Sequence, residues 1–410
     1  MDSACWHLRR LPGNDMKRSR MKTLKSGLIL LATGCMIWMT LTACSGSGKG
    51  GKSDPVLFYV GSGDREQEYS IFLCALDPVN LAFSVLDSFA GAPGSGYLDL
   101  SPDGKTLFAI SSESIPGDEG NSSVASFSVN PADHSLELIN RQSSRGSGIC
   151  HVQAGPGGDY VFAAHYNSGH VSVLPVSGDG RIGTATSVVR GEGSGPVESR
   201  QEGPHAHQVN MDPSGKFLLV PDLGTDKVMN YLFDSKSGSL TPNPAQSFLK
   251  MEPGTGPRHL AFHPSWKYVY VLGELSATVT ACRFESSTGK LELINSASIV
   301  EDGFAGSKQS AAVRVHPDGR YIYASNRSDV SNLAVFEKQE DGSIRQIQII
   351  RDIPYWPRDF NISPDGMFLV VAGARVHEIE LLEVDPRSGR LSKTGVMERL
   401  PSPICILFVH

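Results

Sequence analysis

A short proline-containing phrase recurs six times along this chain at nearly constant spacing. Each copy follows an apolar segment and precedes a β-branched or aromatic one, which is the pattern of a hairpin with proline in its turn. A period of about 50 residues with several strands per unit is typical of a β-propeller. The six copies are Ser101-Pro102-Asp103-Gly104, Gly155-Pro156-Gly157-Gly158, Asp212-Pro213-Ser214-Gly215, His263-Pro264-Ser265-Trp266, His316-Pro317-Asp318-Gly319 and Ser363-Pro364-Asp365-Gly366.

A second turn phrase alternates with the first and occurs seven times, for example at Phe233-Asp234-Ser235 and Val384-Asp385-Pro386. One repeat therefore lacks its own inner hairpin. Apolar strands at residues 56–60 and 404–409 supply the missing pair, and their pairing removes two exposed sheet edges. The sequence predicts an all-β, seven-bladed β-propeller over residues 55–410, closed by its N- and C-terminal strands.

The first 54 residues differ in kind from the repeats. Basic residues precede an apolar stretch at residues 27–41, which is too short to span a bilayer comfortably and resembles a secretory leader. The stretch ends in Leu41-Thr42-Ala43-Cys44, which resembles the lipobox of bacterial lipoproteins. We expect residues 1–43 to be a signal peptide, Cys44 to carry lipid, and residues 44–54 to form a Gly/Ser/Lys tether.

An ordinary signal peptide or a buried helix is the alternative for this leader. Met16 and Met21 are more usual starting points for such a signal than Met1, so the first 15 to 20 residues are interpreted as an overextended start. A lipoprotein of this kind is exported and anchored to the cell envelope, and it contacts the membrane through its lipid alone. The remaining cysteines, Cys74, Cys150, Cys282 and Cys405, have no CxxC spacing and are expected to be buried thiols.

Composition narrows the class of partner. The chain has 410 residues and a net charge of −6, so no basic face for nucleic acid is expected. The 40% hydrophobic content suits one packed domain across the repeats. We expect a monomer that binds a small molecule and needs no cofactor.

Alignment of the repeats on their turn proline places ionisable residues at one end of the inner hairpins. Positions six before the proline and nine or ten after it are cross-strand neighbours. This registry predicts that Arg258 faces Glu274 and that His207 faces Asp222. The residues expected to converge at the mouth of the central channel are His151, His165, His205, His207, Asp222, Arg258, His259, Glu274, Arg327 and Arg358.

Structural salt bridges and turn hydrogen bonds are the alternative explanation for each of these residues. Their joint clustering favours an anion-binding pocket with acid–base groups. His205 and His207 share one face of the expected strand and have metal-binding potential, but the arginines would repel a cation, so no metal is expected.

Several segments together resemble the lactonase family of seven-bladed propellers, which includes propeller-type 6-phosphogluconolactonase and carboxy-muconate cyclase. The resemblance covers residues 55–410 and implies an anionic ring-ester substrate, with catalytic groups at His205 or His207, Arg258, Glu274 and Arg327. The segments are Gly203-Pro204-His205-Ala206-His207, Val220-Pro221-Asp222-Leu223-Gly224, Gly256-Pro257-Arg258-His259, Glu274-Leu275, Ser325-Asn326-Arg327 and Pro357-Arg358-Asp359-Phe360.

Lactone hydrolysis needs an activated water, a stabilised oxyanion and a held anionic group. Glu274 or His207 would take the water proton, Arg258 would polarise the carbonyl, and Arg327 and Arg358 would bind the anion. The remaining residues, His151, His165, Asp222 and His259, are expected to line the substrate pocket. Two alternatives stay open: a non-catalytic, lipid-anchored binding module, and a cyclase that forms lactones from muconates.

Overall fold

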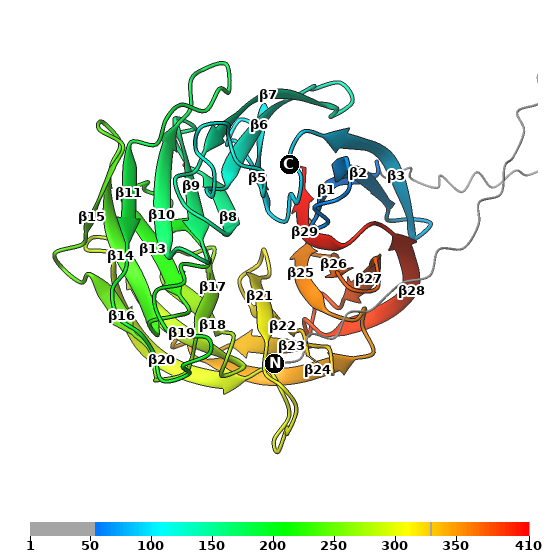
Figure 1. Ribbon diagram of the computed structural model, residues 1–410. Helices are drawn as coiled ribbons and strands as arrows, with labels where there is room; N and C mark the ends of the chain where they lie inside the picture. Colours follow the sequence, from blue (N-terminus) through cyan, green and yellow to red (C-terminus); the bar gives the residue numbers. More distant parts are fainter. Residues whose placement is uncertain (1–53, 329, 410) are drawn as a thin grey trace, which may run out of the picture. The chain divides into compact units, whose positions relative to one another are not determined.

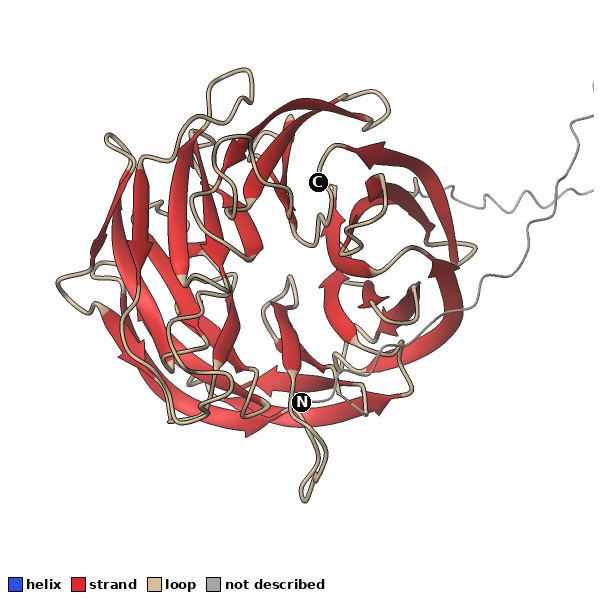
Figure 2. Ribbon diagram, viewed as in Figure 1, coloured by secondary structure: helices blue, strands red, loops and turns tan. Residues whose placement is uncertain are grey.

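The computed structural model describes residues 54–328 and 330–409. These residues form strands and no helices, as Figure 2 shows, so no helix suited to crossing a membrane occurs among them. Seven antiparallel sheets are arranged in a ring, with their innermost strands around the central axis of the predicted channel (Figure 1). The predicted all-β, seven-bladed propeller is therefore confirmed. The leader, Cys44 and the tether lie outside the described residues, apart from Asp54.

The terminal blade combines the two ends of the chain, in the order β29-β1-β2-β3 from the channel outward. Phe58 pairs with Phe408, and Val60 pairs with Ile406, so the closing strands run antiparallel as expected. In Figure 1 the red end of the chain lies beside its blue beginning. The strands of this blade are β29 (Pro403–Phe408), β1 (Val56–Ser62), β2 (Tyr69–Asp77) and β3 (Ala82–Ala90).

The other six blades follow one another along the chain, each with its first strand innermost. Blades 1 to 3 contain β4 (Leu98–Leu100), β5 (Thr106–Ser111), β6 (Ser123–Val129) and β7 (Leu136–Ser143); β8 (Ile149–Ala154), β9 (Tyr160–His165), β10 (His170–Pro175) and β11 (Ser187–Arg190); and β12 (Asn210–Met211), β13 (Phe217–Asp222), β14 (Lys227–Asp234), β15 (Ser239–Pro242) and β16 (Phe248–Lys250).

Blades 4 to 6 are regular four-stranded sheets. They contain β17 (Pro257–Phe262), β18 (Tyr268–Gly273), β19 (Thr278–Glu285) and β20 (Lys290–Ser298); β21 (Ser310–Val315), β22 (Tyr321–Asn326), β23 (Asn332–Lys338) and β24 (Ile344–Arg351); and β25 (Pro357–Ile362), β26 (Phe368–Gly373), β27 (Glu378–Val384) and β28 (Leu391–Arg399).

The two turn phrases occupy the expected places. In blades 1 to 6 the proline phrase joins the innermost strand to the second, and the other phrase joins the third strand to the fourth. All of these turns therefore lie at one end of the blades. The opposite end carries the links between blades, and there the second strands finish with residues such as His165, Asp222 and Gly273.

Apolar side chains fill the spaces between neighbouring blades. Tyr270 and Leu272 of blade 4, for example, pack in one cluster with Val313 and Ile322 of blade 5, all of them fully buried. Such burial stabilises by roughly 25 cal/mol per Å² of apolar surface. The four cysteines of the propeller are free, as expected, and three of them are buried.

Polar side chains tie the innermost strands to one another around the channel. Asp99 Oδ2 accepts the Ala154 N–H at 2.8 Å, and Gln153 Oε1 accepts the Met211 N–H at 2.7 Å. Gln208 Oε1 accepts the Leu260 N–H at 2.6 Å in the same way. Since the innermost strands of adjacent blades are not paired in one sheet, these bonds satisfy backbone groups that would otherwise lack partners.

Candidate functional site

A repeated irregularity at the start of the innermost strands turns selected side chains out of the blades. The pairing register shifts between Pro257 and His259 and again between Pro357 and Asp359, so Arg258 and Arg358 occupy equivalent bulge positions. A bulge leaves one residue unpaired and redirects its side chain. Cys150 takes the same position in blade 2.

Arg258 meets Glu274, which directly follows β18, as the registry predicts. The Arg258 Nε atom lies 3.0 Å from Glu274 Oε2, in ion-pair contact but without good hydrogen-bond alignment. Arg327 Nη2 donates to the same oxygen at 2.9 Å. The exposed fractions of these side chains are 3% for Arg258, 8% for Arg327 and 1% for Glu274. We expected these side chains at the mouth of the central channel, open to solvent, but all three are buried.

A third arginine, Arg200, completes the cluster and was missed from the sequence. Its Nη2 donates to Glu274 Oε1 at 2.6 Å, and its side chain is 33% exposed. Arg200 lies in the long link between β11 and β12, where no repeat aligns it. The Tyr166 hydroxyl accepts from Arg200 Nε at 3.3 Å and from Nη2 at 3.2 Å. Tyr166 was likewise not predicted as a site residue.

The arginines determine the charge state of Glu274. Burial opposes ionisation of this carboxyl, but Arg327, Arg258 and Arg200 outweigh it and lower its pKa to about 2. Glu274 is therefore a carboxylate throughout the physiological pH range.

Arg358 is the arginine of this cluster that forms no ion pair with a carboxylate of the described residues. Burial and repulsion from Arg327 lower its pKa to about 10, which still leaves it charged at neutral pH. Within residues 54–328 and 330–409, no carboxylate forms an ion pair with it. Arg358 and Arg258 line a cavity of about 110 Å³ together with Arg65, an exposed arginine that the repeat alignment did not identify.

Three histidines form an aromatic group next to the arginines. The His259 ring lies 5.5 Å from the His207 ring and 5.9 Å from the His151 ring, with edge-to-face geometry. Burial, followed by repulsion from Arg258, lowers the pKa of His207 and of His259 well below the usual range. Burial also lowers the pKa of His151. The three rings are thus neutral, and the Nδ1 atoms of His151 and His207 have no hydrogen-bond partner among the described residues.

The second expected pair, His207 with Asp222, does not form between side chains. Asp222 Oδ1 accepts the N–H groups of His205 at 2.8 Å and Gly224 at 3.0 Å, so this carboxylate holds the backbone. Ala206 and Asp222 form an isolated bridge, and β12 begins only at Asn210. The expected strand under His205 and His207 is therefore absent from the described structure.

His205 and His165 use both ring nitrogens within the protein. His205 stacks on Tyr166 at 4.4 Å and bonds to the Tyr166 carbonyl and to Glu202. His165 bonds to the His170 carbonyl at 3.0 Å and to Ser144 Oγ at 2.8 Å and is fully buried. These contacts leave neither ring a free nitrogen for a substrate. No group of three or more His, Cys, Asp or Glu residues suited to a metal occurs in the described part of the chain.

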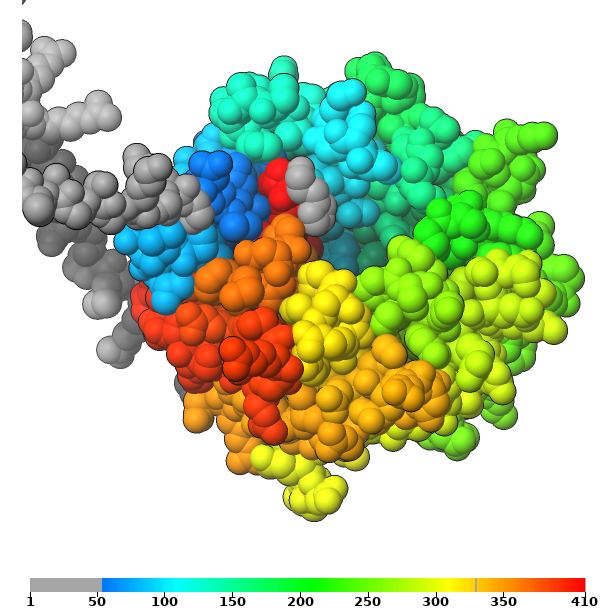
Figure 3. All heavy atoms as spheres, turned by 180° about the vertical axis from the view of Figure 1, so that it is seen from behind, coloured from blue at the N-terminus to red at the C-terminus, as the bar shows by residue number. Residues whose placement is uncertain are grey.

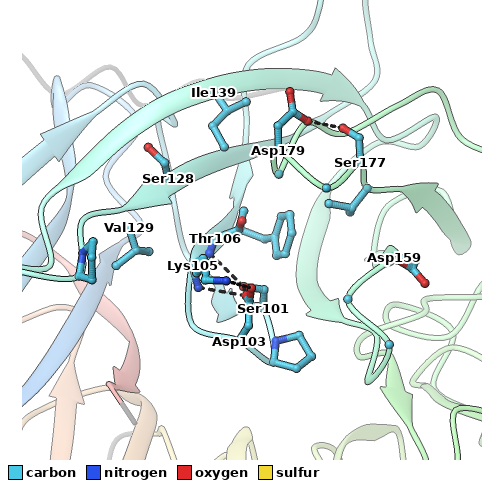
Figure 4. Close-up of a pocket in the computed structure, with 18 residues that line it drawn as sticks. Ser101, Asp103, Lys105, Thr106, Ser128, Val129, Ile139, Asp159, Ser177 and Asp179 are labelled. Carbon is cyan, nitrogen blue, oxygen red and sulfur yellow. Dashed lines mark hydrogen bonds and ion pairs between the residues drawn. The ribbon is translucent and has the colours of Figure 1, made fainter.

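Two further cavities differ from the arginine cluster in chemistry. One of about 250 Å³ lies between the innermost strands and shares Tyr97 with the smaller cavity beside Arg358. A larger one, of about 580 Å³, is lined by turn residues such as Asp103, Ser177 and Asp179 (Figure 4). Asp103 and Asp179 bond within their own turns there, which is a structural use of these carboxylates. Figure 3 shows a depression at the centre of the ring of blades.

The fold defines a class of protein, a seven-bladed β-propeller, which here carries a buried cluster of arginines around one carboxylate. Residues 57–408 match the family Lactonase, 7-bladed beta-propeller, and the chain belongs to that family. It is 33% identical to 6-phosphogluconolactonase of Bacillus subtilis (strain 168), over 86% of this chain and 98% of that protein.

Solved structures agree with this assignment. A putative 6-phosphogluconolactonase from Bacteroides fragilis NCTC 9343 is 28% identical, with a TM-score of 0.80 over 87% of this chain and 98% of that one. A periplasmic gluconolactonase from Pseudomonas aeruginosa is 27% identical, with a TM-score of 0.80 over 87% and 99% of the two chains.

Proposed function

We propose that this enzyme, a carboxylic ester hydrolase that opens lactones, acts on a sugar lactone with an anionic group, at the cluster around Glu274. The observation that carries the proposal is one buried carboxylate held by three guanidinium groups, beside a fourth that forms no ion pair with a carboxylate of the described residues. The relationship to proteins named 6-phosphogluconolactonase supports a phosphorylated sugar lactone as the substrate.

The charge balance of the cluster favours an anion. Burial, followed by repulsion from Arg327 and Arg358, lowers the pKa of Arg258, but a guanidinium paired with a carboxylate stays protonated in a protein. Four arginines, Arg200, Arg258, Arg327 and Arg358, therefore face the single negative charge of Glu274, and the neighbouring histidines are neutral. Asp359, which also lines the cavity beside Arg358, is paired with Arg314. Excess positive charge with buried walls attracts and concentrates anions. The planar fork of arginine also matches the geometry of phosphate and carboxylate oxygens.

The residues present supply the steps of hydrolysis. Water attacks the carbonyl carbon while Glu274 accepts a water proton, and Arg258 stabilises the negative charge that develops on the carbonyl oxygen. The ring C–O bond then breaks, and the proton on Glu274 returns to the leaving alkoxide oxygen, giving a hydroxy acid. Arg327 and Arg358 bind the anionic group. His207 is the alternative proton acceptor, since it is neutral and no described residue bonds to its Nδ1.

The other predicted residues support this site in different ways. His151 and His259 contribute neutral aromatic walls beside the arginines. Asp222 and His205 position the backbone and Tyr166, and His165 braces blade 2. We assign these last three residues to support of the site and not to contact with substrate.

Export remains part of the proposal. The lipobox at Cys44 predicts a lipid-anchored protein of the cell envelope, and the periplasmic location named for the Pseudomonas aeruginosa relative is compatible with it. An enzyme outside the cytoplasm would require a lactone that is also found there. The comparison of phosphorylated with unphosphorylated substrates is therefore the informative one.

The test is a pH-stat assay of the chain against sugar lactones with and without phosphate. We expect hydrolysis above background that is lost in Glu274→Gln, and a loss of turnover of about 100-fold or more in Arg258→Ala. Arg327→Ala should mainly raise KM for the anionic lactone. Arg190→Ala is the matched control, since Arg190 donates to the Ser168 carbonyl and not to Glu274.

The proposal fails if no lactone is hydrolysed. It also fails if activity per folded molecule survives both Glu274→Gln and Arg258→Ala, because these residues would then be structural braces. A preference for unphosphorylated lactones would refute a phosphorylated substrate, whereas the assignment as a lactone hydrolase would still hold.

A further inference from the structure

The two oxygens of the Glu274 carboxylate are held very differently. Oε2 contacts Arg258, at the bulge that begins β17, and Arg327, which directly follows β22; their side chains are 3% and 8% exposed. Oε1 contacts Arg200, which is 33% exposed and lies on the link between β11 and β12. One oxygen is therefore fixed by the rigid blades, and the other is covered by a single, accessible side chain.

This arrangement conflicts with a role of Glu274 as proton acceptor. A general base works best when its pKa lies near the working pH, and the pKa of Glu274 is about 2. The charged or titratable groups that act on Glu274 are Arg200 from the link, Arg258 from β17, Arg327 after β22, Arg358 from β25 and Cys150 from β8.

Arg200 is the arginine of this set that is already partly exposed, so it can move away from Glu274 without a buried guanidinium having to leave its place. Its movement would uncover Oε1. Arg258 and Arg327 would keep Oε2 in place, so the carboxylate would stay oriented while Oε1 became available to water. Loss of one arginine neighbour typically raises a carboxyl pKa by roughly 1 to 3 units.

We propose that Arg200 is a positioning residue that covers Glu274 Oε1 in the free enzyme and moves to the anionic group of the substrate on binding. This inference rests on the proposed function, since it assumes that Glu274 is the base for an anionic lactone. It couples recognition to catalysis: a substrate without the anion would leave Oε1 blocked. Specificity for anionic lactones would then appear in turnover as well as in binding.

Tyr166 provides the second anchor that such a movement requires. Its hydroxyl accepts from two nitrogens of Arg200, and its ring is fixed by stacking on His205 at 4.4 Å with an interplanar angle of 12°. Arg200 can therefore keep its hydrogen bonds to the Tyr166 hydroxyl while it exchanges Glu274 Oε1 for the anionic group of the substrate. Tyr166→Phe should therefore weaken the preference for anionic lactones in the same direction as Arg200→Ala.

The kinetic test uses a matched pair of six-membered sugar lactones, one with a phosphate and one without. In Arg200→Ala, kcat/KM for the phosphorylated lactone should fall about tenfold or more, whereas kcat for the neutral lactone should rise, because Oε1 is free. The acid limb of the pH profile should move upward by roughly 1 to 3 units. Arg190→Ala, the control on the same part of the chain, should change none of these quantities.

An unchanged ratio of the two kcat/KM values in Arg200→Ala would overturn the inference. So would an unmoved acid limb, which a merely structural arginine would also give. Arg200→Lys should restore part of the preference, since it retains the charge but loses the fork that reaches both Tyr166 and Glu274.

A second measurement separates this inference from the proposed function. The Glu274 carboxyl carbon, assigned through Glu274→Gln, is titrated by ¹³C NMR in the full-length chain with and without inorganic phosphate. We expect its pKa to rise in Arg200→Ala and, in the wild type, on addition of phosphate. If no lactone is hydrolysed but these rises occur, the function fails and the Arg200 exchange stands. If Glu274 titrates identically in all samples, the exchange is refuted.

Discussion

Glu274→Gln should destabilise the folded protein by an amount that follows from its ion pairs. In the native state burial raises the pKa of this carboxyl, but Arg327, Arg258 and Arg200 outweigh burial and bring the pKa from 4.5 down to about 2. A shift of that size, at 1.36 kcal/mol per unit, corresponds to about 3 kcal/mol at neutral pH. Because Glu274 is almost fully buried, solvent screening reduces this figure little.

The pH dependence of this stabilisation has a definite sign. A carboxyl whose pKa is depressed on folding stabilises the native state above its unfolded pKa, and this contribution disappears as the pH falls through the native pKa. The Glu274 contribution should be complete above about pH 4.5 and should be lost towards pH 2. The wild type and Glu274→Gln should therefore differ most at pH 7 and converge in acid.

Urea unfolding monitored by tryptophan fluorescence between pH 2.5 and pH 7 measures this difference. Glu292→Gln is the control, since Glu292 is 80% exposed and contacts Arg283 only at 3.9 Å; it should change stability by less than about 0.5 kcal/mol. The reasoning would be refuted if Glu274→Gln were as stable as the wild type at pH 7, or if their difference in stability did not change with pH. The ion pairs between Glu274 and the arginines would then contribute nothing to the stability of the folded protein.

Three further perturbations test the fold and the leader. Removal of the chain from Pro403 onward deletes β29 with the buried Ile406 and Phe408, each worth roughly 2 kcal/mol, so we expect insolubility or a greatly lowered Tm; a Tm like the parent's would contradict closure by the terminal strands. Thr106→Tyr should stabilise by about 1 kcal/mol in urea unfolding, because the added ring occupies the part of the 580 Å³ cavity next to Thr106; a loss of stability would contradict this, and Thr106→Ser is the control. Cys44→Ser should abolish incorporation of labelled fatty acid; equal labelling of both forms would refute the lipobox assignment.

The Thr106 prediction rests on a comparison among the blades. The second strands of blades 2, 4 and 5 begin with Tyr160, Tyr268 and Tyr321, whereas that of blade 1 begins with Thr106. The Tyr160 hydroxyl bonds to a turn carbonyl of the next blade at 3.1 Å, and the Tyr321 hydroxyl does so at 2.7 Å. The cavity in Figure 4 is found at the interface where this aromatic ring is missing.

The fold was predictable because its signals are local and repeated. A turn proline constrains its own backbone whatever surrounds it, and six copies at nearly constant spacing indicate six of the seven blades. Closure of the ring followed from the excess of one turn phrase over the other, and the pairing of Val60 with Ile406 confirms it. No long-range information was needed for either step.

Arg200 was not predictable in this way because the link between β11 and β12 contains no repeat. Contacts across the fold determine where this segment lies. Gln201, fully buried, donates from Nε2 to the Leu223 carbonyl and to Asp226 Oδ1, both at 2.8 Å, and so fixes the link beside blade 3. The sequence marks neither partner as belonging to Gln201, and the position of Arg200 depends on both.

The same registry succeeded in blade 4 and failed in blade 3, and the backbone explains the difference. In blade 4 the two strands pair along their length except at a bulge, and this bulge at Arg258 turns its side chain towards Glu274, so that the two side chains form an ion pair. In blade 3 the chain at His205 is not a regular strand, and its unpaired N–H recruits the Asp222 carboxylate as a substitute partner. A carboxylate that accepts backbone N–H groups in this way does not point into the pocket to bind a cation or a substrate. Cross-strand position therefore predicts which residues come near one another. Whether the acidic side chain then binds a cation or accepts a backbone N–H depends on whether the neighbouring backbone groups are already paired in the sheet.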